Sequence, residues 1–420
     1  MKILWLVNIT FPEVDYLLTG NESLFNVSGG WLLGSAEALI SSGDVKLYVV
    51  SVDKRVKKLT KLEGKKVTYY LIPRGRGVSK KNHKYDSYCK TICQEVLPDV
   101  VHIHGTEFSH GNSYVTSCST DNVVLSVQGI LSAIGEYYHS GITKFEIYRN
   151  LTLFDMIRGS MIARRKEFQK RAKYEKETLE NVKYVIGRTD FDESRVRLIN
   201  PNIEYFKCNE TLRNEFYDNT IWQYKKCKKH SIFISQSSYP LKGLHQVLKA
   251  MPLILKHYPD ATIRIAGRDI ASINSYKDYM FLTNYGKFIR SLIKRYSLET
   301  KVKFLGRIDG LQMKEEYLLC NVYICPSSVE NSPNSLCEAQ IIGTPCVASY
   351  VGGIPSLMRG NENNLYRFEE YSMLADIVCK IFSLGDQQIN MIDIARERHD
   401  PKKNNDQLMR IYKTIIQNKK

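Results

Sequence analysis

The chain has 420 residues, of which 43% are hydrophobic and 25% charged, and its formal net charge is +16 at pH 7. This length is too great for one ordinary core and predicts two domains of about 200 residues each. The composition excludes a disordered chain, and no apolar run reaches the roughly 18 residues that a membrane span needs. The ten scattered cysteines form no Cys-x-x-Cys pair and no zinc-type cluster, which favours reduced core thiols in a cytoplasmic protein.

The positive charge is concentrated in two basic stretches, residues 54–90 and 158–173. The first contains 13 Lys and Arg residues against two acids, Glu63 and Asp86. A solvated face is one interpretation of such runs. Anionic lipid, phosphorylated substrates and nucleic acid are the others.

In the first half, short β-branched runs alternate with amphipathic stretches, which is typical of βαβ units and parallel sheets. Helices are expected at 31–42 and 190–199, and a long helical stretch from about 144 to 181 interrupts the alternation. The strands predicted here are 2–8, 45–52, 66–72, 99–105, 122–128, 182–188 and 202–208.

The second half repeats this alternation after a Lys-rich stretch, 222–231, which we interpret as a hinge. Strands are predicted at 231–237, 261–267, 301–306, 322–328 and 344–349. The predicted fold class is α/β, with two doubly wound, Rossmann-like parallel-sheet domains facing each other across a cleft. The expected parts are an N-terminal domain (1–221), a C-terminal domain (222–402) and a terminal helix (403–420) that packs back on the N-terminal domain.

In such sheets ligands bind at the carboxyl ends of the strands, and the glycine pair Gly29 and Gly30 follows the first strand. Glycine lets the backbone approach a ligand closely, and a helix beginning there favours an anion. A simple turn explains the pair equally well. The stretch is not Gly-x-Gly-x-x-Gly, which argues against a nicotinamide dehydrogenase.

The stretch "VHIHGTE" places polar groups at the end of another N-terminal strand. We interpret His102 and His104 as facing opposite sides of this strand, with His104 and Glu107 at its cleft end. Gln128 ends the next strand, where an amide can hydrogen-bond a hydroxylated ligand. A structural histidine bonded to backbone is the alternative. No third ligand has suggestive spacing, so no metal is expected.

In the C-terminal half, "SQSSYPLKGL" places a polar loop, with Gln236 and Ser237, between a strand and a helix. Lys242 and Gly243 open that helix. An ammonium and a helix N-terminus both favour an anion, so this loop predicts a phosphate site. A surface lysine without a ligand is the alternative.

The stretch "SSVENSPNSLCEA" follows the strand 322–328 and carries Glu330 and Glu338. We expect Ser332 to cap a helix with Pro333 at its first position, whose free N–H groups around 333–336 favour a phosphate. Carboxylates accept hydrogen bonds from vicinal hydroxyls, which suits Glu330 to a sugar and Glu338 to a ribose. We expect the Glu338 carboxylate to face solvent.

These residues resemble the Glu-x7-Glu motif of retaining glycosyltransferases with the GT-B fold, in the family-4 class (glycosyl transferases group 1). "SSVENSPNSLCEAQIIGTPCVASYVGGIPSLM" is similar to the core signature of that family, and "YPLKGL" and "SGGW" look like its phosphate-lysine and N-terminal glycine loops. "VHIHGTE" resembles a bacterial branch that builds surface polysaccharides.

The resemblance implies a role for each matching position. Lys242 and Glu330 would be catalytic, holding the donor diphosphate and the transferred sugar. The other donor-binding residues would be Glu338, Gly29, Gly30, Gln236, Ser237, Asn334, Ser335, Leu336 and Arg268. The acceptor and sugar side would be formed by His104, Glu107 and Gln128. Arg268 is proposed because the usual arginine before the phosphate lysine is missing, and Gln128 stands where many members have a histidine.

The reaction implied is transfer of a sugar from a nucleotide-diphosphate donor to an acceptor hydroxyl with retention. It would need no cofactor and no metal, because lysine and helix dipoles offset the charge of the leaving diphosphate. The implied acceptor is a glycan or a polyprenyl-diphosphate-linked molecule in bacterial surface polysaccharide assembly. The basic stretches would then meet an anionic surface on the inner face of the membrane.

Two alternatives stay open. A GT-B sugar-nucleotide epimerase would share the donor site and would need no acceptor. A basic nucleic-acid-binding protein would explain the charge, but it leaves Glu330 and Glu338 unexplained and lacks an aromatic RNA-stacking signature. We therefore expect no nucleic acid as a partner.

Overall fold

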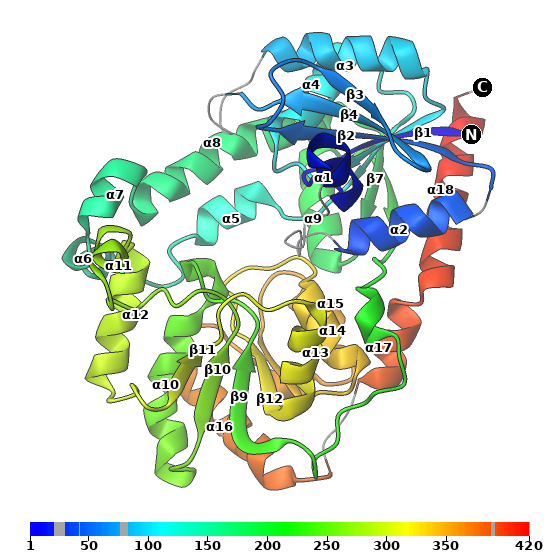
Figure 1. The fold of residues 1–420 in the computed structure, drawn as a ribbon. Helices are drawn as coiled ribbons and strands as arrows, with labels where there is room; N and C mark the ends of the chain where they lie inside the picture. Colours follow the sequence, from blue (N-terminus) through cyan, green and yellow to red (C-terminus); the bar gives the residue numbers. More distant parts are fainter. Residues whose placement is uncertain (21–29, 42, 76–82, 388–390, 420) are drawn as a thin grey trace. The chain divides into compact units, whose positions relative to one another are not determined.

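The computed structural model describes residues 1–20, 30–41, 43–75, 83–387 and 391–419 (Figure 1). The chain divides into two compact units. Unit 1 comprises residues 1–132, 168–213 and 398–420, and unit 2 comprises 133–167 and 214–397. None of the described helices combines the length and the apolar composition needed to cross a bilayer.

Unit 1 is built on an eight-stranded sheet in the order β3-β4-β2-β1-β5-β6-β7-β8. Neighbouring strands are parallel except the antiparallel pair β3 and β4. The strands are β1 (Lys2–Leu6), β2 (Lys46–Asp53), β3 (Thr60–Glu63), β4 (Val67–Pro73), β5 (Val100–His104), β6 (Val123–Ser126), β7 (Tyr184–Gly187) and β8 (Glu204–Lys207).

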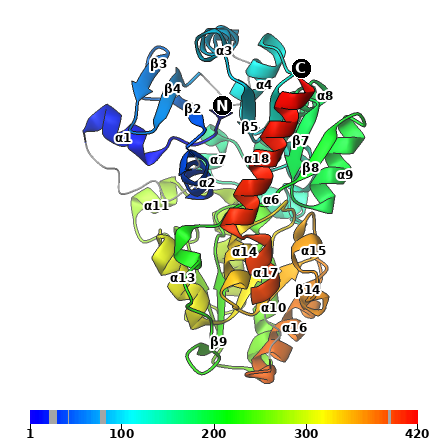
Figure 2. The ribbon, with the colours of Figure 1, turned by 90° about the vertical axis from the view of Figure 1, so that its right-hand side faces the viewer.

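The helices of unit 1 connect these strands and cover the sheet. They are α1 (Pro12–Thr19), α2 (Gly30–Ser41), α3 (His83–Val96), α4 (Ser109–Ser117), α9 (Asp190–Ile199) and α18 (Pro401–Asn418). Helix α18 contacts α2 and β5 (Figure 2). Its apolar face joins the core around Trp5 through Leu408, Ile411 and Ile415, so the end of the chain completes unit 1.

Unit 2 contains a six-stranded, wholly parallel sheet in the order β11-β10-β9-β12-β13-β14. Its strands are β9 (Lys228–Ile234), β10 (Thr262–Ile265), β11 (Val302–Phe304), β12 (Cys320–Cys325), β13 (Cys346–Ser349) and β14 (Leu365–Tyr366). Strands β12 and β13 are buried along their whole length, as expected for a parallel sheet covered on both faces.

The helical elements of unit 2 are α6 (Lys144–Arg149), α7 (Leu153–Arg158), η1 (Asn214–Phe216), η2 (Pro240–Lys242), α10 (Leu244–His257), α11 (Tyr276–Met280), α12 (Asn284–Arg295), α13 (Gly310–Leu319), α14 (Asn334–Ile341), α15 (Ile354–Leu357), η3 (Glu362–Asn364) and α16 (Tyr371–Leu384). Three helices cross the unit boundaries: α5 (Leu131–Tyr137), α8 (Met161–Glu180) and α17 (Ile392–Arg398).

The prediction of two α/β domains with parallel sheets is confirmed. Every predicted strand has a counterpart, and β3 and β14 are additional. The stretch from about 144 to 181 is helical as expected, but it consists of three helices, because capping boxes at Thr143 and Thr152 begin two separate short helices before α8. A capping box satisfies the first N–H groups of a new helix and so marks a restart.

The compact units also differ from the predicted domain ranges. Residues 133–167 belong to unit 2, where the Ser140 carbonyl accepts a hydrogen bond from His245 Nε2 at 2.9 Å. The predicted hinge, 222–231, lies inside unit 2. There the Trp222 backbone N–H and its indole N–H donate to the carbonyls of Ile342 and Cys320, each at 2.7 Å.

Candidate active site

Two loops meet at the carboxyl edge of the unit 2 sheet. The loop after β9 ends in η2 with Lys242, and the loop after β12 carries Glu330. The Ser328 N–H donates to the Leu241 carbonyl at 2.8 Å, which joins the two loops through their backbones. Gly243 has a φ of +67°, and a Cβ there would overlap the Pro326 carbonyl oxygen. Only glycine fits this contact.

This loop contact brings Lys242 and Glu330 together. Lys242 Nζ lies 2.5 Å from Glu330 Oε1, and the two side chains are only 19% and 17% exposed. Ser327 Oγ donates to the same carboxylate oxygen at 2.9 Å. Burial alone would lower the pKa of Lys242, but the attraction of Glu330 outweighs it and raises the pKa above its ordinary value. Lys242 is therefore an ammonium at neutral pH.

The glycine pair of "VGGIP" packs against the Glu330 loop. The Gly353 N–H donates to the Glu330 carbonyl at 2.9 Å. Gly352 has a φ of +53°, and a Cβ there would overlap the same carbonyl oxygen. The pair therefore supports the backbone that carries Glu330.

Helix α14 begins beside these loops, but one residue later than expected. Pro333 is the N-cap rather than the first helical residue, and no side chain caps this helix. The N–H groups of Leu336 and Cys337 donate back to the Pro333 carbonyl at 3.0 and 3.3 Å. The expectation that Ser332 caps the helix is thus wrong, because Pro333 takes that place with an extended backbone. The first turn still presents N–H groups suited to an anion.

Tyr323 connects the same two loops, although no motif in the sequence marks it. Its hydroxyl lies 2.9 Å from Ser235 Oγ after β9 and donates to Ser335 Oγ in the first turn of α14 at 3.0 Å. Burial raises the pKa of Tyr323 well above its ordinary value. From the sequence, a tyrosine in the apolar stretch "VYIC" is expected only to pack in the core. Its hydroxyl contacts are visible only in the tertiary structure.

Glu338 lies one turn into α14 and is only 5% exposed. The expectation that its carboxylate faces solvent is wrong, because helix α14 is packed along most of its length. Of the other predicted donor residues, Gln236 is exposed and Ser237 is buried. Arg268 follows shortly after the end of β10, is 67% exposed and lies 3.7 Å from Asp278.

In unit 1, the predicted glycine loop is only partly described. Gly29 lies outside the described residues, and Gly30 is the first residue of α2. His104 ends β5 and is buried, with its ring centroid 3.8 Å from that of His102. The interpretation that these histidines face opposite sides is wrong, because residues two apart on a strand share a face. Burial, helped by His102, lowers the pKa of His104, which is neutral at pH 7.

Glu107 connects three segments at the carboxyl edge of the unit 1 sheet. Its carboxylate accepts hydrogen bonds from the Gly129 N–H at 2.8 Å and from Asn8 Nδ2 at 2.9 Å. Asn8 also donates to the His104 carbonyl at 3.1 Å. Burial raises the pKa of Glu107 above its ordinary value. These contacts make Glu107 a support of the loops around it.

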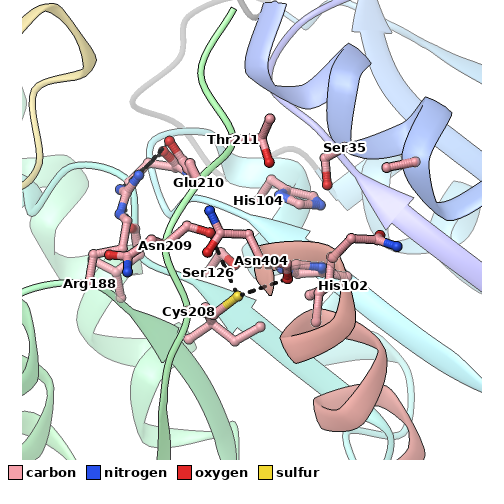
Figure 3. A pocket seen from close by; sticks show the side chains of 16 residues that line it. Ser35, His102, His104, Ser126, Arg188, Cys208, Asn209, Glu210, Thr211 and Asn404 are labelled. Carbon is pink, nitrogen blue, oxygen red and sulfur yellow. Dashed lines mark hydrogen bonds and ion pairs between the residues drawn. The ribbon is translucent and has the colours of Figure 1, made fainter. Parts of the chain in front are cut away.

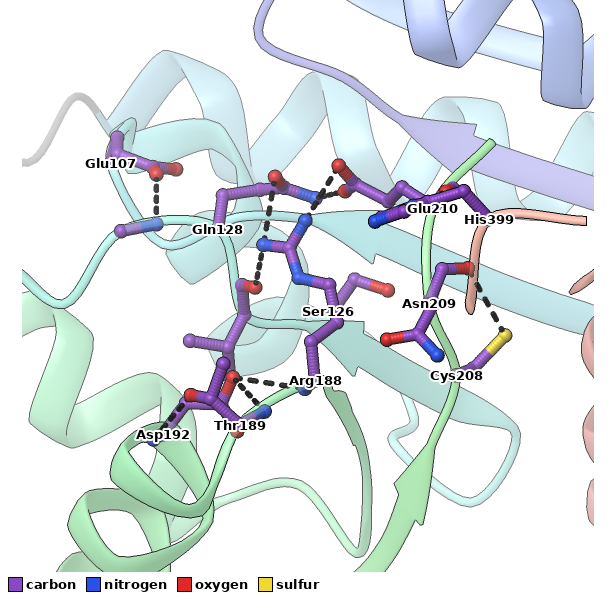
Figure 4. A network of polar contacts seen from close by, with 12 residues as sticks. Glu107, Ser126, Gln128, Arg188, Thr189, Asp192, Cys208, Asn209, Glu210 and His399 are labelled. Atoms are coloured by element: carbon purple, nitrogen blue, oxygen red, sulfur yellow. Dashed lines mark hydrogen bonds and ion pairs between the residues drawn. The ribbon is translucent and has the colours of Figure 1, made fainter. Parts of the chain in front are cut away.

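Gln128 belongs to a buried polar network that extends to β7 and the loop after β8 (Figure 4). Its Nε2 donates to Glu210 Oε1 at 2.7 Å, and its Oε1 accepts from Arg188 at 3.3 Å. Arg188 and Glu210 form an ion pair at 2.5 Å, with exposures of 5% and 12%. Arg188 also donates to the Val127 carbonyl at 2.9 Å.

A cavity of about 50 Å³ adjoins this network (Figure 3). It is lined by His104, Gln128 and Arg188 on the strand ends and by Asn404 on α18, among others. His104 and Gln128, which lie far apart in sequence, are therefore brought to one cavity. Glu107 is not among its lining residues.

Residues 218–398 match the family model of the glycosyl transferases group 1. This range lies almost wholly in unit 2 and includes Lys242, Glu330 and α14. The chain is 29% identical over 139 residues to an uncharacterized glycosyltransferase of Methanocaldococcus jannaschii, covering 33% of this chain and 32% of the relative. It is 26% identical over 182 residues to a D-inositol 3-phosphate glycosyltransferase of Corynebacterium urealyticum, covering 42% and 41%. The matches thus span about a third to two fifths of these curated relatives.

Solved structures resemble the chain over nearly its full length. Sucrose-phosphate synthase from Thermosynechococcus elongatus has a TM-score of 0.69 at 16% identity, covering 99% of this chain and 98% of that one. WaaG, a glycosyltransferase involved in lipopolysaccharide biosynthesis, has a TM-score of 0.61 at 13% identity, covering 96% and 98%. At these identities the likeness establishes the fold, which is GT-B.

Proposed function

We propose that this chain is a glycosyltransferase that moves a sugar from a nucleotide-diphosphate donor to an acceptor hydroxyl, with retention at the anomeric carbon. The observation that carries this proposal is the buried Lys242–Glu330 pair at the carboxyl edge of the unit 2 sheet, beside the start of α14. The match of residues 218–398 to the glycosyl transferases group 1 supports the reaction class.

Lys242 and α14 would bind the donor diphosphate. The ammonium of Lys242 is held in a largely desolvated position, where its attraction for phosphate is strong. The first turn of α14 adds N–H donors and the positive end of a helix dipole. Glu330 would then accept hydrogen bonds from the sugar hydroxyls, and Glu338 from the ribose.

The chemical step would be a displacement on one face of the sugar. The bond between the anomeric carbon and the diphosphate oxygen breaks, and the acceptor oxygen bonds to the same face of that carbon. The acceptor proton passes to an oxygen of the leaving phosphate. Lys242 stabilises the charge that develops on that phosphate, which is the largest contribution a preorganised cation offers. Glu330 as a covalent nucleophile is the less favoured route, because its carboxylate already pairs with Lys242.

The acceptor side would lie in unit 1, at His104, Glu107 and Gln128. Arg188 and Glu210 hold Gln128 in place, and Glu107 supports the neighbouring loop. We propose a glycan or a polyprenyl-diphosphate-linked acceptor in surface polysaccharide assembly, met at an anionic membrane face. The net charge of +16 supports such a face.

A donor screen with matched variants tests the proposal. UDP-, GDP- and other activated sugars would be followed by thermal stabilisation and by slow donor hydrolysis. Lys242→Met and Glu330→Gln should abolish donor stabilisation. Arg264→Met and Glu316→Gln form the control, because that pair in the same unit is equally short, at 2.5 Å, and equally buried, at 20% and 14% exposed.

The control variants should lose similar stability yet still bind donor. Equal donor affinity in all four variants would refute the assignment of Lys242 and Glu330. Inversion at a sugar carbon with the product still a sugar nucleotide, in the absence of any acceptor, would favour the epimerase instead.

A further inference from the structure

Unit 2 carries a group of exposed apolar side chains on α6, α7 and the segment around α11. We name this group the apolar patch. Its members are between 49% and 80% exposed. They are Phe145, Tyr148, Leu153, Met156, Ile157, Tyr276, Tyr279 and Phe281. Soluble proteins rarely gather so many large apolar side chains without a partner.

The two segments that carry the patch are packed on each other, at the left of Figure 1. Thr152 Oγ1, at the start of α7, donates to the Leu282 carbonyl at 2.7 Å. Lys287 Nζ on α12 donates to the Leu151 carbonyl at 3.2 Å. The rings of Phe154 and Phe281 meet edge to face, with centroids 5.8 Å apart. The two segments that carry the patch are therefore held together in unit 2 rather than being separate loops.

Positive charge surrounds the patch on the α6–α7 side. Within residues 143–165 the exposed charged side chains are all basic. They are Lys144, Arg149, Arg158 and Arg164. The two acids of this range, Glu146 and Asp155, turn their carboxylates back onto the backbone in capping boxes. The surface thus combines apolar tips with a cationic rim.

This combination fits an anionic lipid bilayer. Phe, Met and Ile side chains gain by entering the acyl region, tyrosines favour the interface, and lysine and arginine bind the headgroups. A second copy of the chain fits less well, because a two-fold interface places each patch against itself. The basic rims would then face each other.

We propose that the apolar patch docks this protein on an anionic membrane, with Phe145, Met156 and Ile157 entering the bilayer. The patch adjoins the basic stretch 158–173, whose Arg158 and Arg164 belong to its rim, but Met161 inside that stretch is buried. The apolar side chains that face solvent precede that stretch. This inference deepens the proposed function, on which it rests for its purpose, since a lipid-linked acceptor lies at such a surface.

Co-sedimentation with vesicles tests the docking. The full chain should bind vesicles containing phosphatidylglycerol at low salt and bind phosphatidylcholine vesicles weakly. The double variant Met156→Asp, Ile157→Asp should have an affinity for these vesicles at least roughly tenfold lower, because burial of an aspartate side chain in lipid costs free energy. Leu198→Asp is the matched control, since Leu198 is 83% exposed on α9 of unit 1 and lies outside the patch. It should bind like the parent chain.

Arg149→Gln and Arg158→Gln should each weaken binding roughly fivefold at low salt, and salt should remove the difference. Equal loss in the Leu198 control, or no binding at low salt, would overturn the proposal. A dimer in sedimentation velocity that the double variant abolishes would assign the patch to a second copy instead. Donor hydrolysis in solution should be unchanged in the double variant, which separates this outcome from failure of the proposed activity.

Discussion

The two units use the carboxyl edges of their sheets differently. In unit 1 the charged groups at this edge are tied to each other and to the backbone, as Arg188 is to Glu210 and Val127 and as Glu107 is to Gly129. In unit 2 the edge presents one short lysine–glutamate pair beside a helix start that no side chain caps. The unit 1 contacts fix the loops after several strands, whereas in unit 2 the ammonium of Lys242 and the first turn of α14 lie together at the place where we propose that the donor diphosphate binds.

The difference also appears in how each edge is held. Helix α18 closes unit 1 through the Tyr412 hydroxyl, which accepts from Trp5 Nε1 at 3.0 Å and lies 2.6 Å from His102 Nδ1. Unit 2 holds its edge by close backbone contact at Gly243 and Gly352. Polar residues at a sheet edge are therefore not all ligand contacts, and their partners decide which they are.

The largest expected difference between the two units is in how much stability each loses when the pH is lowered. Burial lowers the pKa of His102 to about 3 and those of His110 and His399 to about 4, all in unit 1. Between these values and the ordinary 6.5, the unfolded chain binds more protons than the folded one, so stability falls as pH decreases. A difference of one in pKa between the folded and the unfolded chain corresponds to about 1.4 kcal/mol of unfolding free energy.

Unit 2 has a strongly depressed pKa at His245, about 3, and a lowered pKa at His139, both caused mainly by burial. Hydrogen exchange at pH 7 and pH 4.5 should show amide protection lost first in β1, β5 and β6. Equal loss in β9 and β12 would contradict the comparison.

The next largest effect is expected when the cation of the unit 1 network is removed. Arg188→Met should cost about 3–5 kcal/mol of unfolding free energy, because it leaves the buried Glu210 carboxylate without its cation. Arg197→Met, in an exposed i,i+4 pair with Glu193, should cost less than about 1 kcal/mol. Urea denaturation measures both. A similar cost for the two variants would mean that the buried network does not hold this edge.

The smallest expected effect isolates the close contact in unit 2. Gly243→Ala meets both a positive φ and the Pro326 carbonyl, whereas Gly267→Ala meets a positive φ of +106° with open space around it. The difference between the two variants should be about 1–3 kcal/mol, the usual cost of overpacking. Gly243→Ala should also weaken donor binding, because the overlap displaces the loop that carries Lys242. Thermal unfolding with and without donor measures both effects. Equal stability and equal donor binding in the two variants would mean that the contact between Gly243 and Pro326 does not matter for either.

The strands were the part of the fold most accessible from sequence. Runs such as "VYIC" and "KILWL" are apolar almost without interruption, which a parallel sheet buried on both faces requires. The helices between 144 and 181 were harder. The boundaries of these helices depend on Thr143 and Thr152. The sequence does not show whether such a threonine caps a new helix or lies inside a longer one, because that depends on the path of the chain.

The candidate site was partly predictable for the same reason. Lys242, Glu330 and the start of α14 each follow a strand, and parallel strands bring their carboxyl ends to one edge. The contact between the lysine and the glutamate, 88 positions apart, was not predicted. Neither was Tyr323, because an internal strand tyrosine gives no sign of its hydroxyl partners.

The sequence by itself determined the alternation of strands and helices, the parallel sheets and the loops that carry Lys242 and Glu330, because these follow from local pattern and chain order. Only the tertiary structure decided which polar groups pair, that Glu338 is buried and that apolar side chains gather on α6, α7 and α11. These features depend on contacts between residues far apart in the chain, and no local pattern encodes the distance between two side chains.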